Sequence, residues 1–246
     1  MKKRLLMKNS KGFVSLASLN LIVIFISLYF TLCFSVRLIA IKNYVRKTCL
    51  LESVRSQKKI LRIEKKLVQL NPLSTTLRSQ IKITQVALAI ATVNSQAALI
   101  VLLQKKLVEL YAQQKKLDLL QKSIIYQIQL LLAYESQSII QKVKQSVDAD
   151  SSDWADIIQT QSNFSKNNLS EVAFMPDSEG GLGPNYVLKK NAERLQSLSF
   201  IWQYSFTTLE RFQAYIFWNN HLKMVCAASP QFGGHLWSVK ISQGKL

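Results

Sequence analysis

The sequence of 246 residues contains few of the residue types that enzymes use for catalysis and metal binding. It has two histidines and three cysteines. No second His, Cys or carboxylate stands at a metal-ligand spacing from His221 or His235. A nucleophile elbow, a Cys-x-x-Cys pair and paired carboxylates are absent too. We therefore expect neither an enzyme, nor a cofactor, nor a metal site.

Glycine and proline are also scarce, with seven and four residues. Neither occurs in the stretches 38–70 and 75–147. This absence excludes a turn-rich fold there and favours long helices. Glycines gather instead in segment 180–184, which lacks the Lys-Ser/Thr of a phosphate loop. We interpret this segment as part of a linker.

Acidic residues are few, and the shortage is confined to one part of the chain. Residues 1–147 contain 24 Lys and Arg against 5 Asp and Glu, a net charge of +19, whereas residues 148–246 contain 8 against 9, a net charge of −1. Such a block attracts anionic lipid, an acidic partner or nucleic acid. We expect a basic surface made of Lys58, Lys59, Lys65, Lys66, Lys105, Lys106, Lys115 and Lys116.

Behind a basic leader at residues 1–12, no charged residue occurs from Phe13 to Val36. A helix of this length spans about 36 Å, enough for a hydrocarbon core of about 30 Å. The run is too long for a cleaved signal peptide, so residues 13–36 are predicted to form a transmembrane anchor. Basic residues flank both ends, so charge bias does not give the orientation.

Residues 37–147 are predicted to continue the anchor as basic helices, in a helical hairpin or a coiled coil. Ile60, Ile63, Leu67 and Leu70 form one helical stripe, and Asn71-Pro72 breaks it. Ser74 is then expected to cap the next helix.

That second helix is predicted over about 75–147, where one apolar stripe keeps a heptad spacing with two glutamines at interrupting positions: Leu103, Leu107, Leu110, Gln114, Leu117, Gln121, Ile124, Ile128 and Leu131. Residues 83–104 contain no charge. They are long enough for a second crossing, but polar residues lie at their centre, so a buried helix is the alternative.

The last hundred residues change character. Residues 148–197 are acidic and turn-rich, which predicts a linker with a short helix near 154–160. From residue 198 onward apolar and polar residues alternate with a period near two, which is typical of strands. Strands are expected near 199–207, 210–218, 222–228 and 236–242, with a hairpin turn at Asn219-Asn220. Alternating aromatics, from Phe200 to Phe206, are expected to pack a core and not to stack on bases. The predicted fold is α+β, with a small C-terminal antiparallel sheet.

Cysteine usage gives little information about the compartment. Cys33 lies inside the apolar run, so only Cys49 and Cys226 could meet in an aqueous oxidising space. One disulfide between them is possible, but the preferred interpretation is two unpaired thiols that behave as small buried hydrophobic residues.

The basic leader, Lys11-Gly12-Phe13 and the long apolar helix together resemble the N-terminus of type IV pilin-like proteins, the pilins and pseudopilins. The resemblance implies cleavage after Gly12, methylation of Phe13, and an antiparallel sheet behind a long helix, sometimes tied by a disulfide. It covers about 30 residues. The usual glutamate at the fifth mature position is Ala17 here, and the helix over 75–147 has no counterpart in a simple pilin.

These observations predict a single-pass protein of the bacterial inner membrane, with its N-terminus in the cytoplasm and most of its chain extracytoplasmic. We expect a structural subunit of a pilus or secretion-type assembly that associates with copies of itself or with other membrane-anchored subunits. The alternative is a membrane-tethered module whose basic helices contact nucleic acid or anionic lipid.

Overall fold

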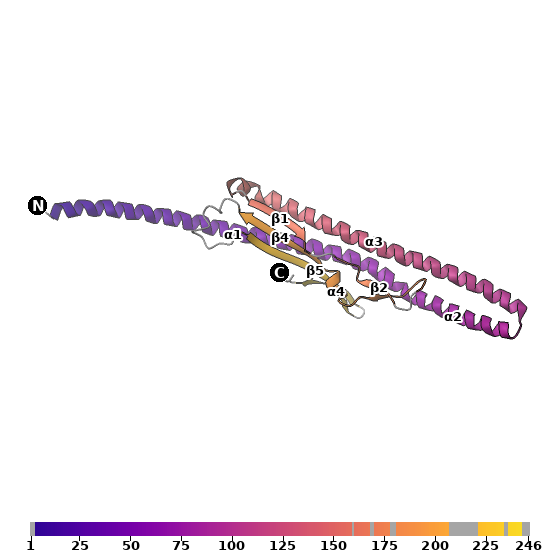
Figure 1. Ribbon diagram of the computed structural model, residues 1–246. Coiled ribbons are helices and arrows are strands. Elements are labelled where there is room, and N and C mark those ends of the chain that lie inside the picture. Colours follow the sequence, from indigo (N-terminus) through magenta and orange to yellow (C-terminus); the bar gives the residue numbers. More distant parts are fainter. Residues whose placement is uncertain are drawn as a thin grey trace. The chain divides into compact units, whose positions relative to one another are not determined.

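The computed structural model describes residues 3–158, 160–167, 170–177, 181–206, 221–233 and 236–242, with side chains for most of them from Ser18 onward. Its elements, labelled in Figure 1, are α1 (Lys3–Gln69), α2 (Asn71–Val93), α3 (Ala97–Ile158), β1 (Thr160–Lys166), β2 (Phe174–Pro176), β3 (Tyr186–Leu188), α4 (Ala192–Leu195), β4 (Leu198–Phe206), β5 (His221–Gly233) and β6 (Leu236–Ser242). Residues Met1–Val45 and Arg46–Leu246 are two compact units. The predicted long N-terminal helix and small antiparallel sheet are confirmed.

Helix α1 ends where the sequence predicts, directly before Asn71-Pro72. The interruption is short because Leu70 keeps a right-handed helical conformation and Pro72 lies in the first turn of α2, where its missing N–H is not needed. The prediction that Ser74 caps α2 is wrong. The N-cap is Leu70, which makes no side-chain hydrogen bond, and the Ser74 hydroxyl donates to the Gly183 carbonyl instead.

Helices α2 and α3 pack along each other as a helical hairpin. The turn between them lies at residues 94–96, where Ser95 adopts a left-handed conformation (φ 52°). The Asn94 N–H donates to the Ile90 carbonyl at 3.0 Å, and the Gln96 N–H to the Ala91 carbonyl at 3.0 Å. The prediction of unbroken helix over 75–147 is therefore wrong, since short polar side chains favour turns over helix interiors. Residues 83–104 form two helix ends and a turn, not one continuous crossing.

The predicted apolar stripe of α3 faces its neighbours in the fold. Leu110, Leu117, Ile124 and Ile128 are buried, as are the interrupting Gln114 and Gln121. Leu110 and Leu117 pack against Leu77 and Ile81 of α2. Pairing of this stripe in a coiled coil stays a prediction.

Four strands form an antiparallel sheet in the order β1-β4-β5-β6. Alternate residues of β4 are buried, with Phe200 and Trp202 at 0% and 1% exposure, and the Phe164 ring of β1 stacks on Phe200. The aromatic face of the sheet is thus a core face, as predicted, and is closed to nucleic-acid bases. The predicted strand 210–218, the turn at 219–220 and the Phe206 side chain lie outside the described residues.

The segment predicted as a linker, 148–197, contributes more structure than expected. Residues up to Ile158 belong to α3 and not to a separate short helix, and β1 pairs with β4 in the main sheet. β2 and β3 pair as a second, two-stranded sheet. Strand β1 is almost entirely polar, so its only sequence signal is Phe164, and pairing with β4 decides its conformation.

Candidate functional site

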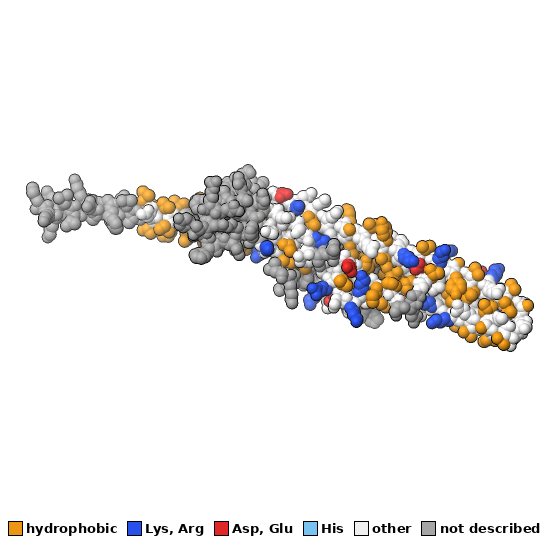
Figure 2. All heavy atoms as spheres, in the orientation of Figure 1, with side chains coloured by type: hydrophobic (Ala, Val, Ile, Leu, Met, Phe, Trp, Pro, Cys, Tyr) orange, Lys and Arg blue, Asp and Glu red, His pale blue; other side chains and the backbone are white. Residues whose placement is uncertain are grey.

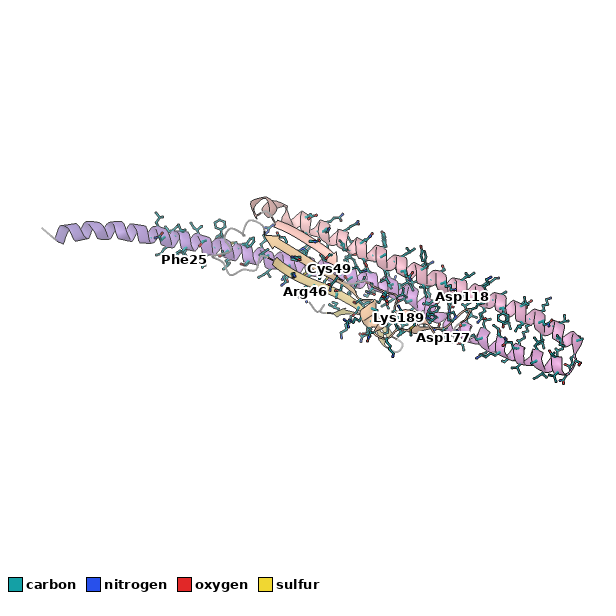
Figure 3. All side chains as sticks on the ribbon, viewed as in Figure 1. Phe25, Arg46, Cys49, Asp118, Asp177 and Lys189 are labelled. Carbon is teal, nitrogen blue, oxygen red and sulfur yellow. A yellow bond between two sulfur atoms is a disulfide. The ribbon has the colours of Figure 1, made fainter. Side chains whose placement is uncertain are left out.

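The first unit exposes an apolar helix surface. One helical stretch of the described residues, Ser18–Val93, contains near the N-terminus an 18-residue window of mean hydropathy 2.3 in which no residue is buried. It is long and apolar enough to cross a membrane by length and composition. Phe25, labelled in Figure 3, is 67% exposed. Gly12 and Phe13 lie within α1, but their side chains are outside the described residues.

Hydroxyl groups in this segment bond to the backbone of their own helix. Ser27 Oγ donates to the Ile24 carbonyl at 2.8 Å, Thr31 Oγ1 to the Leu28 carbonyl at 2.8 Å, and Ser35 Oγ to the Thr31 carbonyl at 2.7 Å. Such bonds satisfy the polar groups without water. This part of α1 can therefore enter hydrocarbon without leaving these hydroxyls unpaired.

In the second unit a disulfide joins Cys49 of α1 to Cys226 of β5. The preferred interpretation of Cys49 and Cys226 as unpaired thiols is therefore wrong, and only the possible disulfide agrees with the structure. Cys33 is a free thiol. Cys226 lies opposite Phe200 in the ladder between β4 and β5, so the bond ties the helix to the core face of the sheet. Cys49 is labelled in Figure 3.

The predicted basic surface is exposed at all eight lysines: Lys58, Lys59, Lys65, Lys66, Lys105, Lys106, Lys115 and Lys116. Lys59 has a second role, because its Nζ lies 2.6 Å from Glu135 Oε1 of α3. The Ser56 hydroxyl donates to the other carboxylate oxygen at 2.5 Å. Burial opposes ionisation of Glu135, but the hydrogen bonds from Lys59 and Ser56 outweigh it and lower the pKa of this carboxyl. This cluster joins α1 to α3.

A second carboxyl of α1, Glu64, is fully buried and has no charged partner among the described residues. Burial raises its pKa to about 8, against weaker opposing effects of the Gln196 side chain and the Ala173 amide. Neither of these groups meets ordinary hydrogen-bond geometry with the carboxyl oxygens. Gln57 on the same face donates to the Gln196 carbonyl at 2.6 Å. The carboxyl is therefore mostly protonated at neutral pH.

The buried face of α1 contains polar residues that were not predicted to be buried. The buried residues of α1 include Cys49, Ser53, Ser56, Gln57, Ile60, Glu64 and Leu67. Their helical spacing is visible in the sequence, but the spacing does not show that the polar members, Ser53, Ser56, Gln57 and Glu64, are buried. The burial of these polar side chains becomes visible only when the helices and strands that pack against α1 are known.

The glycine-rich segment packs against the hairpin and is not a free linker. Gln121 Nε2 of α3 donates to the Pro184 carbonyl at 2.9 Å. Gly183 has a left-handed conformation (φ +62°), and a Cβ placed there would lie 3.2 Å from Gln114 Cγ. The two glutamines that interrupt the apolar stripe thus accommodate this loop, one as a hydrogen-bond donor and the other by close packing.

Paired contacts fix the chain on either side of this loop. Asn71 exchanges two hydrogen bonds of 2.9 Å with the backbone of Tyr186. The Arg78 guanidinium binds both carboxylate oxygens of Asp177, at 3.0 and 3.1 Å. These hydrogen bonds lower the pKa of Asp177. An open cavity of about 440 Å³ lies beside Arg78, lined also by Ile81, Lys82, Gln85, Gln114, Gly181 and Leu182.

No group of three or more His, Cys, Asp or Glu side chains that could hold a metal ion occurs in the described part of the chain. His235 and the side chain of His221 lie outside the described residues.

Comparison with known proteins gives no relative from which a role could be transferred. No family model matches the chain, and no curated protein or solved structure matches it either. A functional proposal therefore rests on the residues and contacts described above.

Proposed function

We propose that the protein is a membrane-anchored structural subunit of a pilus or secretion-type assembly, which acts by helix packing and protein–protein association. The observation that carries the proposal is the apolar window of α1, in which no residue is buried. Continuous apolar surface of this size is unfavourable in water and needs a cover. A bilayer covers a helix of this length and composition on all sides.

The disulfide supports an orientation. Disulfides persist in oxidising compartments and are rare in the cytosol. Cys49 and Cys226 both belong to the unit Arg46–Leu246. We therefore propose a protein of the bacterial inner membrane, with its N-terminus in the cytoplasm and the disulfide-bonded unit on the extracytoplasmic side.

Two features support the pilin-like assignment and two depart from it. A long N-terminal helix with an apolar first part, and a disulfide from that helix to an antiparallel sheet, agree with what the resemblance implies. Ala17 in place of the usual glutamate and the inserted hairpin of α2 and α3 depart from it. These departures favour a specialised subunit over the main building block of a filament.

The test is carbonate extraction of membranes from bacteria that express the full chain, followed by N-terminal analysis. We expect the protein to stay in the membrane pellet and to begin at Phe13 when the pilin peptidase is present. A strain without the peptidase is the control. Release by carbonate would refute the anchor, and an intact Met1 terminus in peptidase-containing cells would refute pilin-like processing alone.

A second candidate function follows from the eight exposed lysines. Contact of the basic helices with nucleic acid would release counterions, so log affinity would fall with log salt by about 0.9 for each phosphate contacted. Anionic lipid would contribute about 1 kcal/mol for each lysine near the surface. Binding of duplex DNA and of phosphatidylserine vesicles to the detergent-solubilised protein, measured between 50 and 200 mM salt (roughly the range of such assays), tests both. Absence of binding at the lowest salt would remove this candidate.

A further inference from the structure

Helix α3 carries a second apolar line on the side away from its buried stripe. We call it the outer seam; its members are Val101, Val108, Ala112, Leu119, Tyr126 and Leu130. All six are exposed, the five larger ones by 53% to 69%. At about 100° per residue they fall within an arc of about 40°, and the line is about 44 Å long. Figure 2 shows hydrophobic side chains continuing along the hairpin surface.

No described element covers the outer seam. Helix α3 packs on α2 and β1, and is bonded to α1 through Glu135 and to the loop at Pro184 through Gln121. These contacts lie on the side of the buried stripe, away from the seam. A single exposed leucine would need no explanation. The six residues of the outer seam, however, are aligned over about eight helical turns and form a regular contact surface. Regular spacing of this kind is what one helix presents to another.

The width of the seam favours a helix over a lipid surface as its partner. An amphipathic helix that lies in a bilayer interface, like one that faces a protein core, buries an apolar face of about 100° or more. The outer seam is less than half as wide. Leu102, Tyr111 and Leu120 are exposed too, but they lie about 80–100° from its centre line. Polar residues stand between them and the seam: Gln104, Lys105, Lys115 and Lys116. A narrow seam with polar flanks is typical of helix–helix pairing.

Charge decides which helix fits. Four lysines lie within about 60° of the centre line of the seam, whereas the nearest acidic residue, Glu109, lies about 80° from it. The lysines are Lys105, Lys115, Lys116 and Lys122. Lys122 pairs with Asp118 of its own helix at 2.8 Å. The other three are exposed.

A second copy of the chain is a poor partner for this seam. The midpoint of the outer seam falls between residues 115 and 116. A two-fold antiparallel pair of α3 helices would therefore bring Lys115 and Lys116 of both copies together. A parallel pair, in which opposite flanks of the two helices meet, would bring Lys115 of each copy beside Lys116 of the other. Like charges at these flanking positions oppose pairing.

We propose that the outer seam of α3 binds an amphipathic helix of a different protein, with an apolar line of its own and acidic residues on both sides of it. This inference names the partner chemistry of the proposed assembly subunit and so rests on that function. The apolar line of the partner helix would bury the outer seam. Its carboxylates would pair with the lysines beside the seam and so make the binding specific for this surface.

Site-specific photocross-linking in the cells that naturally make the protein tests the proposal on the full chain. The probe is p-benzoylphenylalanine at position 119, in the seam. The matched control is the same probe at position 113, which is exposed on α3 but lies about 120° away from the seam. We expect at least about tenfold more adduct at 119, and mass spectrometry should map it to a helical segment of another protein with acidic residues flanking an apolar line.

Charge reversal provides the second measurement. Lys115→Glu with Lys116→Glu should lower the adduct yield at 119 about tenfold, a change of roughly 1.4 kcal/mol. Lys58→Glu with Lys65→Glu on α1 changes the net charge equally and should leave the yield unchanged. Thermal unfolding confirms that both variants remain folded.

Several outcomes would overturn the proposal: an adduct with lipid, an adduct with another copy of this chain, equal yields at positions 119 and 113, or an adduct insensitive to the charge reversal. Carbonate extraction of the same membranes reports on the anchor separately. Failure of the seam and failure of the anchored function can thus be told apart.

Discussion

Cys49 on α1 and Cys226 on β5 are joined by a disulfide across 177 residues of sequence, with their Cα atoms 6.3 Å apart. The bond closes a loop that includes the whole hairpin of α2 and α3. In the chain-entropy model, cross-linking so long a loop lowers the conformational entropy of the unfolded chain. At 25 °C this loss raises the free energy of the unfolded state by about 5 kcal/mol.

Replacing Cys49 by Ser should therefore lower the free energy of unfolding by about 2–5 kcal/mol. Cys33→Ser is the matched control, since Cys33 is a free thiol, and it should change little. Denaturation of the full chain in detergent micelles, followed by tryptophan fluorescence, measures both. Equal stability of the two variants without reductant would contradict a structural role for the disulfide.

Glu64 should make the protein less stable as the pH rises. The pKa of its carboxyl is about 8 in the folded protein against an ordinary value of 4.5, so the folded state binds more protons between these values. The free energy of unfolding should then fall by an amount on the order of 4 kcal/mol from pH 4.5 to 8.

Glu64→Gln keeps the shape of the side chain and removes the titration, so its stability should depend much less on pH in this range. Glu109→Gln, at an exposed position of α3, is the control and should retain the slope. Parallel pH profiles for wild type and Glu64→Gln would show that this carboxyl is not buried as described.

Glu135 should behave in the opposite way. The hydrogen bonds from Lys59 and Ser56 lower its pKa in spite of burial, so its stabilising contribution is present above about pH 4.5 and is lost as the pH falls through the lowered pKa. Glu135→Gln should cost about 1–3 kcal/mol at neutral pH. The loss should shrink in acid. A cost that stays constant down to pH 2 (roughly two units below an ordinary glutamate pKa) would argue against the ionised pair.

Gly183→Ala should destabilise the loop that packs on α2 and α3. The left-handed conformation costs a residue with a Cβ about 1–2 kcal/mol, and Gln114 must also move. Gly233→Ala adds a Cβ where nothing lies within 4 Å and should change stability by less than about 0.5 kcal/mol. Urea denaturation of the two variants makes the comparison. Equal effects would mean that the loop does not pack as described.

The sequence predicted the helices better than their connections. The apolar stripe around Ile60 and Leu67 and the break before Pro72 follow from local spacing and backbone chemistry, and both are present. The turn at residues 94–96 was missed because one left-handed residue, Ser95, ends a pattern that otherwise reads as continuous helix. β1 was missed because a nearly all-polar strand carries no alternation.

The candidate site was predictable only in part. The exposed lysines follow from their positions off the apolar stripe, and all eight are exposed. Glu64 and Glu135 lie on the same helical faces as other polar residues, but their opposite pKa shifts arise from whether a lysine reaches them. A pattern within one helix does not contain that information.

The sequence by itself determined the features that depend on neighbouring residues: an apolar helix long enough to cross a membrane, basic helices behind it, and strands of period two near the C-terminus. Tertiary structure alone decided that Cys49 meets Cys226, that burial raises the pKa of Glu64, and that no described part of the chain covers the outer seam of α3. The physical reason is that helical and strand periods are set by local sterics and hydrophobicity, whereas pairing and burial depend on which distant segments come together.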